Sequence, residues 1–520
     1  MSFMAQQRTT ISDVLARHAR KIPDRVAYRF EGIDRTYAAL DDRVNRLANA
    51  LLERGVRPGD RIAVLTLNNI ETVEAYLASA RLGAITVPVN FRLVADEMAY
   101  ILKDSGVSVI IVDDVLAPVV DKAREQVTAL RHRIVIGGSP HPETGWESYD
   151  HVLDTSTAAE VRIEVDEQTP ALIMYTSGTT GRPKGAVLTH YNLLIHTSSL
   201  LIHLSYPRDC EIWLAATPLF HIAGVAGILP PLFRGDTTVI ARMSAFNAGE
   251  TIELLARERI NVCNFVPAQW QLICDRTDIG EHDLSALRAA AWGAAPATPA
   301  LLHKMMDAFP GTMFYSMFGM TETSPVTTVL MGEDALRKIG SVGTPMLNVE
   351  VRVVDAEMND VAVGDVGEIV YRGPTVMREY WNNPAATEAA FYGGWFHSGD
   401  LVRQDEDGYF YVVDRLKDMI ISGGENIYCA EVENTIAEHP KVADVAVIGV
   451  PDEKWGEVPL AVVVADDPDN PPTPAEVEQW CRERLAVYKC PKRLTVLDVL
   501  PRNASGKVLK TDLRKHLEIH

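Results

Sequence analysis

Residues 61–90 have the sequence RIAVLTLNNIETVEAYLASARLGAITVPVN, in which a segment of helical periodicity lies between two short apolar runs. The runs at 61–67 and 84–90 have the length and the β-branched content of buried strands. The segment 71–83 predicts a helix that ends at Gly83, since glycine commonly ends helices. Strands joined by a helix pair in parallel, so this stretch indicates an α/β fold.

The same alternation of helix and strand continues on both sides of this stretch. Upstream, Thr36 and Gly55 bound a predicted helix whose apolar residues recur at helical spacing. Downstream, strand-like runs recur near 105–113, 170–174, 236–241 and 260–266. Near residue 340 the pattern changes to short β-like runs separated by Gly, Asn and Asp, which predicts an antiparallel section.

A second change of pattern follows Asp414, where about 100 residues suffice for a separate small domain. The elements predicted there are helices near 430–438 and 474–486 and strands near 443–450, 459–465 and 494–498. We therefore expect an α/β protein of two domains. Residues 1–416 form a large domain of mostly parallel sheets and helices with an antiparallel β section, and residues 417–520 form a small mobile α+β domain.

The composition limits the partners and the compartment of the protein. The chain has 520 residues and a net charge of −20, so binding of nucleic acid is not expected. Its six cysteines have irregular spacings, which indicates reduced thiols in the cytoplasm. No apolar run approaches the roughly 18 residues that cross a bilayer, so no integral membrane segment is expected. A loose membrane association stays open, as does the oligomeric state, with a homodimer as one option.

Residues 175–187, YTSGTTGRPKGAV, form a loop rich in glycine and hydroxyl side chains. An apolar run before it predicts a strand, and Thr189 after it can cap a helix. Strand, turn and helix in this order form a context in which backbone N–H groups bind phosphate. The loop is not a Walker A motif, because Pro183 precedes Lys184 and no Ser or Thr follows the lysine. We expect a flexible loop that folds over the phosphates of a nucleotide.

Further segments carry candidate binding residues, in the order PLFHIAG (218–224), WGAAPATPALL (292–302), YSMFGMTET (315–323), GGWFHSGD (393–400), DRLKDMIISGGENIY (414–428) and LPRNASGKVLK (500–510). On these motifs and the loop, the chain resembles the adenylate-forming superfamily over nearly its full length. That superfamily includes acyl-CoA synthetases, luciferases and the adenylation domains of peptide synthetases. Within it, the segments are most similar to those of bacterial fatty-acyl-CoA ligases.

The resemblance implies a role for each segment. The implied catalytic residues are Lys184, Thr321, Glu322 and Lys507. The implied nucleotide contacts are Thr176, Ser177, Gly178, Thr179, Thr180, Gly293, Ala294, Ala295, Phe318, Thr321, Asp400, Arg415 and Lys507. The implied substrate contacts are His221, Val266, Trp270, Gly293 and Met320. Gly423 and Gly424 are the implied lining of the coenzyme A tunnel, and Lys417 is the implied hinge.

Glu322 is also the implied metal ligand, since its carboxylate is the kind of oxygen ligand that magnesium prefers. Two positions depart from the pattern common in the superfamily. Phe318 stands where a tyrosine is common beside adenine, which keeps stacking and loses a hydroxyl contact. Ala294 and Ala295 stand where glycines are often found, and we expect their methyl groups to narrow the pocket.

The resemblance implies a two-step reaction that uses ATP, magnesium and coenzyme A. A carboxylic acid reacts with ATP to give acyl-AMP and pyrophosphate, and coenzyme A then takes the acyl group and releases AMP. In the peptide-synthetase relatives, an aspartate near the segment 218–224 pairs with the amino group of the substrate. Residues 220–223 offer no carboxylate, which argues against an amino acid as the substrate. The expected acyl lining is apolar and comprises Phe265, Val266, Trp270, Ala294, Ala295, Met317, Met320 and Val326.

This lining and the resemblance favour a medium- or long-chain fatty acid as the substrate. An aryl acid of the coumarate type is the main alternative. A further alternative concerns the reaction, since the chain could be a fatty-acyl-AMP ligase or another adenylating enzyme. A nucleotide-binding regulator without catalysis is disfavoured, because Glu322, Asp400, Arg415 and Lys507 are all present.

Overall fold

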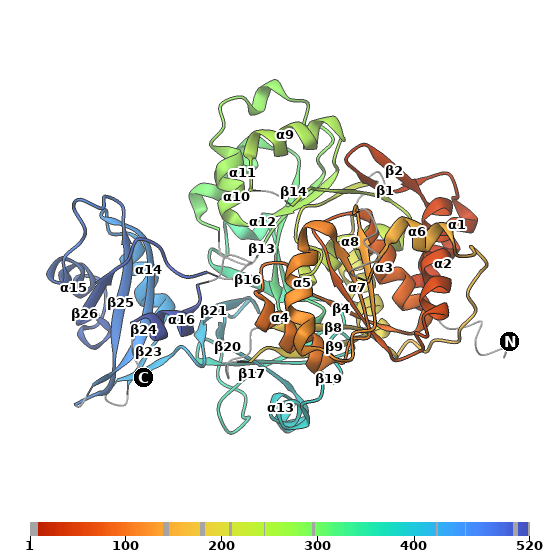
Figure 1. Cartoon of the computed structure of the whole chain (residues 1–520). Coiled ribbons are helices and arrows are strands. Elements are labelled where there is room, and N and C mark those ends of the chain that lie inside the picture. The colour runs from red at the N-terminus through yellow and green to blue at the C-terminus, as the bar shows by residue number, and fades with distance from the viewer. Residues whose placement is uncertain are drawn as a thin grey trace. The chain divides into compact units, whose positions relative to one another are not determined.

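A computed structural model of the chain describes residues 9–138, 145–176, 182–206, 211–243, 245–293, 297–422, 425–452, 454–502 and 508–517 (Figure 1). The chain forms two compact units. The first unit comprises Met1–Glu350 and Tyr371–Phe396, and the second comprises Val351–Val370 and His397–His520. Each unit is described by itself below.

The first unit contains two sheets. One has the order β19 (Glu379–Tyr380), β9 (Lys184–Thr189), β8 (Pro170–Thr176), β4 (Ile85–Pro88), β3 (Arg61–Leu65), β5 (Val109–Asp113), β6 (His132–Ile136) and β7 (Trp146–Ser148). The other has the order β16 (Ser341–Pro345), β15 (Val326–Met331), β14 (Met313–Gly319), β13 (Ala289–Gly293), β12 (Val262–Phe265), β10 (Ile212–Ala215), β11 (Thr237–Ile240), β1 (Val26–Phe30) and β2 (Ile33–Thr36).

Helices surround these two sheets. They are α1 (Ile11–Lys21), α2 (Tyr37–Glu53), α3 (Ile70–Leu82), α4 (Ala95–Ser105), α5 (Ala117–Ala123), α6 (Tyr149–Asp154), α7 (His190–Leu204), α8 (Ile222–Arg234), α9 (Ala248–Arg257), α10 (Pro267–Cys274), α11 (Pro299–Ala308), α12 (Gly332–Ala335) and α13 (Pro384–Ala390). The alternation of strands and helices confirms the α/β fold that the sequence predicts.

The stretch at 61–90 forms β3, α3 and β4, as its sequence predicts. The Asn69 side chain caps α3 by accepting a hydrogen bond from the Thr72 N–H at 2.8 Å. Gly83 ends the helix in the left-handed conformation, with φ of 65°. Helix α3 is buried along its whole length because it contacts strands of both sheets, β1 in one and β3 and β4 in the other.

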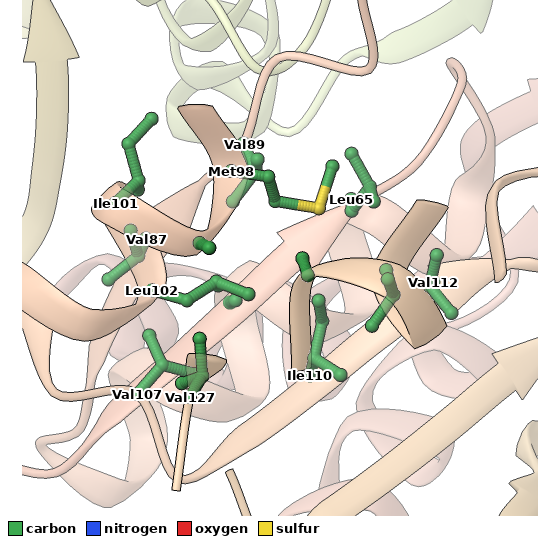
Figure 2. Close-up of a cluster of buried hydrophobic side chains, with 14 of the residues drawn as sticks. Leu65, Val87, Val89, Met98, Ile101, Leu102, Val107, Ile110, Val112 and Val127 are labelled. Atoms are coloured by element: carbon green, nitrogen blue, oxygen red, sulfur yellow. The ribbon is translucent and has the colours of Figure 1, made fainter. Parts of the chain in front are cut away.

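The strands β3, β4 and β5 pack with α4 and α5 around a core of buried aliphatic side chains (Figure 2). Leu65, Val87, Met98, Leu102 and Ile110 are among the residues that face one another there. The three strands pair in parallel, with Ile62 aligned to both Thr86 and Val109. Strands that are buried on both faces need continuous apolar runs. The runs at 61–67 and 84–90 are of this kind.

In the second sheet, strands β1, β11, β10, β12, β13 and β14 all pair in parallel. The carboxyl ends of these strands therefore lie along one edge of the sheet, where ligands bind in open α/β sheets. Strands β15 and β16 continue the sheet in antiparallel pairing, which confirms the antiparallel section expected near residue 340.

The second unit has two groups of strands. Strands β17 (Glu350–Val354), β18 (Val366–Arg372), β20 (Phe396–Gln404) and β21 (Phe410–Arg415) are neighbours in that order. The other group has the order β23 (Glu425–Ile427), β22 (Ile420–Ser422), β25 (Gly456–Ala465) and β24 (Val442–Asp452), with β26 (Arg493–Val496) beside β25. The helices are α14 (Cys429–Ala437), α15 (Pro474–Arg482) and α16 (Lys510–His516).

The elements expected after Asp414 are therefore present. The helix expected near 474–486 is shorter and ends at Arg482. The boundary expected between a domain of residues 1–416 and a domain of residues 417–520 stays a prediction. In the part of the chain that the structure describes, no helix is both long and apolar enough to cross a membrane.

Candidate active site

The loop at 175–187 belongs to a β-hairpin, which corrects the expected order of strand, turn and helix. From Lys184 on, this stretch belongs to β9 (Lys184–Thr189), which pairs antiparallel with β8 and aligns Lys184 with Thr176. Helix α7 begins only at His190, with Thr189 as its N-cap. Residues 185–189 form a strand and not the start of a helix. They are apolar or small, and all of them are buried against neighbouring strands. The N-terminus of α7 thus lies one strand length away from the loop.

Glu322 is the centre of the polar site in the first unit. It lies in a 3₁₀ turn, Thr321–Thr323, directly after β14, and only 5% of it is exposed. Its Oε1 accepts hydrogen bonds from the Tyr380 hydroxyl at 3.0 Å and from the Thr176 hydroxyl at 3.4 Å. The structure therefore brings together Thr176 and Glu322, which the sequence analysis assigns to one nucleotide site.

Tyr380 is a site residue that the sequence analysis missed. It lies in β19, which pairs with β9 and aligns Tyr380 with Ala186. The Lys184 ammonium lies over the Tyr380 ring, 5.2 Å from its centroid. Burial and the Glu322 carboxylate raise the pKa of the Tyr380 hydroxyl, so it stays a hydrogen-bond donor. In the sequence, Tyr380 is marked only by an aromatic pair with Trp381, which is too common a pattern to indicate a site.

The oxygen atoms around Glu322 fit a magnesium ion. Carboxylate and hydroxyl oxygens are hard ligands of the kind that magnesium prefers. Among the described residues, no cluster of three or more His, Cys, Asp or Glu side chains could hold a metal ion. A single buried carboxylate suits magnesium, which is usually held by one or two carboxylates together with the phosphates of a substrate.

His221 lies at the N-terminus of α8. Its Nδ1 accepts a hydrogen bond from the Ala223 N–H at 3.2 Å, and burial lowers the pKa of the imidazole. The ring is therefore neutral and carries its proton on Nε2. A side chain at Gly224 would meet the Pro218 carbonyl oxygen at 2.1 Å, so this glycine allows the His221 loop to lie against the helix.

Asn68 and Tyr76 hold the loop that precedes His221. The Asn68 amide donates to the Thr217 carbonyl at 3.0 Å, and its oxygen accepts from the Leu219 N–H at 2.9 Å. The Tyr76 hydroxyl donates to the Leu219 carbonyl at 2.8 Å. The sequence analysis missed both residues, because they lie about 150 positions before the loop that they bind.

The half-buried residues in the first half of α8 are small. Ala223, Ala226 and Gly227 recur at helical spacing, so they share one side of the helix. At Gly227 an added side chain would meet only the Thr217 hydroxyl, at 3.9 Å. This side of α8 therefore carries little side-chain volume, and a methyl group at Gly227 would otherwise meet open space.

The other predicted substrate contacts lie near the carboxyl ends of the parallel strands. Val266 follows β12, Gly293 ends β13, and Met320 follows β14, all of them half-buried. Trp270 is different, because it is fully buried and its Nε1 donates to the Ala291 carbonyl at 2.9 Å. Its ring packs against those of Phe265, Phe309 and Phe314. Trp270 thus has the surroundings of a core residue, and its contact with substrate stays a prediction.

The second unit pairs two of the predicted nucleotide contacts. Asp400 in β20 aligns with Arg415 in β21, and Asp400 Oδ1 lies 2.5 Å from Arg415 Nε. Asp400 is only 3% exposed, whereas Lys417 is exposed. Asp414 accepts hydrogen bonds from the N–H groups of Arg415 and Cys429, which attaches this segment to the start of α14.

Phe318 and Thr321 are half-buried in the first unit, on β14 and in the turn that follows it. The remaining predicted site residues lie outside the described residues. They are Ser177, Gly178, Thr179, Thr180, Ala294, Ala295, Gly423, Gly424 and Lys507. Their roles stay predictions.

Comparison with known proteins adds to this geometry. Residues 15–381 match the family model "AMP-binding enzyme", and residues 431–507 match "AMP-binding enzyme C-terminal domain". The chain is 42% identical over 500 residues to a feruloyl-CoA synthase of Amycolatopsis sp., covering 96% of this chain and 97% of that protein. It is 37% identical over 524 residues to the long-chain-fatty-acid–CoA ligase FadD13 of Mycobacterium tuberculosis, covering 99% and 98%.

A solved structure is similar over the same length. It is o-succinylbenzoate coenzyme A synthetase from Bacillus subtilis in complex with ATP and magnesium ion. The TM-score is 0.84 at 33% identity, covering 96% of this chain and 99% of that one.

Proposed function

The chain belongs to the family of AMP-binding enzymes and is an adenylate-forming acid–CoA ligase, and we propose that the acid it activates is aromatic. ATP, magnesium and coenzyme A serve the reaction of this family. The observation that carries the proposal is the half-buried side of α8, where Ala223, Ala226 and Gly227 carry little side-chain volume. A flat ring can enter a space lined by such small side chains. The 42% identity to a feruloyl-CoA synthase supports the same choice.

A fatty acid is the second candidate, and it is the substrate that the sequence analysis favours. It is supported by the 37% identity to FadD13 and by the apolar side chains of Val266, Met317 and Met320 near the strand ends. These side chains would suit an alkyl chain as well as a ring.

In the first half-reaction, a carboxylate oxygen of the acid attacks the α-phosphate of ATP, and pyrophosphate leaves. We assign Lys184 and the hydroxyl-rich loop to the departing phosphates and Thr321 to the α-phosphate. Glu322 would hold a magnesium ion, which supplies positive charge to the phosphates when bound. Tyr380 and Thr176 orient the Glu322 carboxylate through their hydroxyl groups.

His221 and the second unit complete the assignment. The Nε2–H of the neutral His221 ring would orient the acid at the mouth of the acyl site. We assign Asp400 and Arg415 to the ribose and phosphate, and Lys507 to the charge that develops during adenylation. In the second half-reaction, the thiol of coenzyme A replaces AMP on the acyl carbon. A pivot at Lys417 and a tunnel at Gly423 and Gly424 would serve this step.

A panel of acids tests the proposal. Pyrophosphate release is measured with ATP, magnesium and coenzyme A present, using ferulate, 4-hydroxycinnamate, benzoate and saturated fatty acids from C6 to C18. We expect the highest kcat/KM with a substituted cinnamate. A higher kcat/KM with any fatty acid than with every aromatic acid would contradict the proposal and favour the second candidate.

A further inference from the structure

Asn264 is a polar residue near the end of a buried parallel strand, and no function described above uses it. It is half-buried in β12, between Cys263 and Phe265, both of which are buried. Its carboxamide oxygen is shielded from solvent and has no hydrogen-bond partner among the residues that the structure describes. Buried polar atoms are nearly always paired, so a shielded acceptor of this kind calls for an explanation.

The register of the sheet shows which face Asn264 occupies. Side chains of aligned residues in parallel strands lie on the same face, as do residues two apart in one strand. Asn264 shares its face with Val262, which aligns with Trp213. Trp213 aligns with Thr238, and Thr238 aligns with Tyr28. All these side chains therefore lie on one face of the sheet.

Helix α8 covers this same face. A small cavity of about 20 Å³ is lined by Tyr28 together with Val225, Ile228, Leu229 and Leu232 of α8. Phe265, the next residue after Asn264, points the other way, toward Trp270 and Phe246. Asn264 thus lies on the side of the sheet that carries α8 and the His221 loop.

Asn264 also lies at the same end of the sheet as His221. Strand β10 ends at Ala215 and leads through the His221 loop into α8. Asn264 is the last residue but one of β12, which is the neighbour of β10. The residue aligned with it in β13 is Ala291, whose methyl group leaves space beside the carboxamide. The next aligned residue, Tyr315, already has its hydroxyl paired with that of Tyr206 at 2.6 Å.

We propose that Asn264 is a specificity residue whose carboxamide oxygen accepts a hydrogen bond from a hydroxyl or N–H group on the ring of the substrate. The proposal rests on the assignment of an aromatic acid as substrate. The ring substituent would supply the donor that the described part of the chain does not supply. A site built around a buried acceptor rejects a substrate that lacks the donor, because the acceptor is then left unpaired.

A pair of acids that differ by one hydroxyl tests the proposal. The kcat/KM for pyrophosphate release is measured with 4-hydroxycinnamate and with cinnamate, for the wild-type protein and for Asn264→Leu. We expect the wild type to prefer the hydroxylated acid by at least roughly tenfold, since an unpaired buried group is costly. In Asn264→Leu we expect this preference to disappear through a loss with 4-hydroxycinnamate, while cinnamate is used as well as before.

Two controls make the measurement specific. Cys263→Ala alters the neighbouring buried residue on the opposite face of the same strand, and it should leave the preference unchanged. Both acids are measured on one preparation, so the ratio does not depend on the fraction of folded protein. If Asn264→Leu does not fold, Asn264→Ser takes its place with a smaller polar side chain. Its preference for 4-hydroxycinnamate over cinnamate should be lower than that of the wild type.

The outcomes separate this proposal from the assignment of an aromatic acid. Turnover of both acids with the same ratio in wild type and variant would overturn the role of Asn264 and leave the aromatic substrate in place. Turnover of neither acid by the wild type, with turnover of a fatty acid, would overturn both. Loss of the preference in Asn264→Leu but not in Cys263→Ala supports the role of Asn264 and the assignment of an aromatic acid.

Discussion

Glu322 is a buried carboxylate whose orientation depends on residues from distant parts of the chain. Thr176 comes from β8 and Tyr380 from β19, and both donate to the same carboxylate oxygen. The backbone carbonyl of Glu322 also accepts a hydrogen bond from the Met377 N–H at 2.7 Å, which binds the segment before β19. The carboxylate is therefore oriented before any substrate arrives, which is how a site lowers the cost of organising charge during reaction.

The Tyr380→Phe substitution tests this orientation. It removes the hydroxyl that donates to Glu322 and keeps the ring beneath Lys184. We expect kcat/KM for pyrophosphate release to fall about tenfold or more, because a hydrogen bond to a charged group contributes about 1.5 kcal/mol or more. The substitution Tyr392→Phe, at an exposed tyrosine of the same unit, is the matched control. Equal activity of the two variants would contradict the role of Tyr380.

We expect the stability of the protein to depend on pH through His190. It is fully buried, its ring nitrogens have no hydrogen-bond partner among the described residues, and burial lowers its pKa to about 4. Its ordinary value is 6.5, so between pH 6.5 and about 4 the unfolded chain binds more protons than the folded one. Stability is therefore lost as the pH falls through this window.

Urea unfolding at pH 7 and at pH 5 measures the effect. We expect the wild type to lose more free energy of unfolding between these pH values than His190→Leu, which has no group to protonate. His303→Leu, at an exposed histidine in the first unit, serves as the control and should lose as much as the wild type. Identical losses in wild type and His190→Leu would contradict the prediction.

At the scale of elements, the hairpin β8–β9 is where the sequence analysis was wrong. A strand, a glycine-rich loop and a helix cap do occur in that order, but β9 lies between the loop and α7. Strand β9 is only six residues long and mostly apolar, and its pairing with β8 and β19 is what makes it a strand. The helix α2 was predicted well because its apolar residues recur at helical spacing, and α3 because its cap and its terminal Gly83 bound a largely apolar segment.

The N-cap of α7 gives a prediction at this scale. The Thr189 hydroxyl accepts a hydrogen bond from the Asn192 N–H at 3.1 Å, and the Asn192 side chain accepts from the Thr189 N–H at 2.8 Å. We expect Thr189→Ala to lower the free energy of unfolding by about 1 kcal/mol and Thr189→Ser to lower it much less. Urea unfolding of both variants measures this. A loss from Thr189→Ser as large as that from Thr189→Ala would show that the hydroxyl cap is not the cause.

At the scale of the whole molecule, the assigned residues are divided between two compact units. Thr176, Lys184 and Glu322 belong to the first unit, and Asp400 and Arg415 belong to the second. The reaction has two half-reactions with different chemistry, and a second unit that pivots can serve each of them in turn.

Separate assays of the two half-reactions test this division. We expect Lys507→Ala to lower the rate of acyl-AMP formation by roughly a hundredfold or more, because it removes a charge that stabilises the reacting phosphate. Formation of the thioester from synthesised acyl-AMP should change little. Lys515→Ala, on the exposed surface of α16, is the control. An equal loss in both half-reactions would contradict the assignment.

The sequence by itself determined the α/β class, the antiparallel section and most helices and strands, and its motifs predict the residues assigned to the nucleotide. Periodicity and short ordered motifs carry this information locally, so it can be read without knowing which segments meet. The tertiary structure alone decided that Tyr380 binds Glu322, that Asn68 holds the His221 loop, and that the Asn264 carboxamide oxygen has no partner among the described residues. These facts depend on contacts between residues 58 and 151 positions apart and on strand register, neither of which any local pattern records.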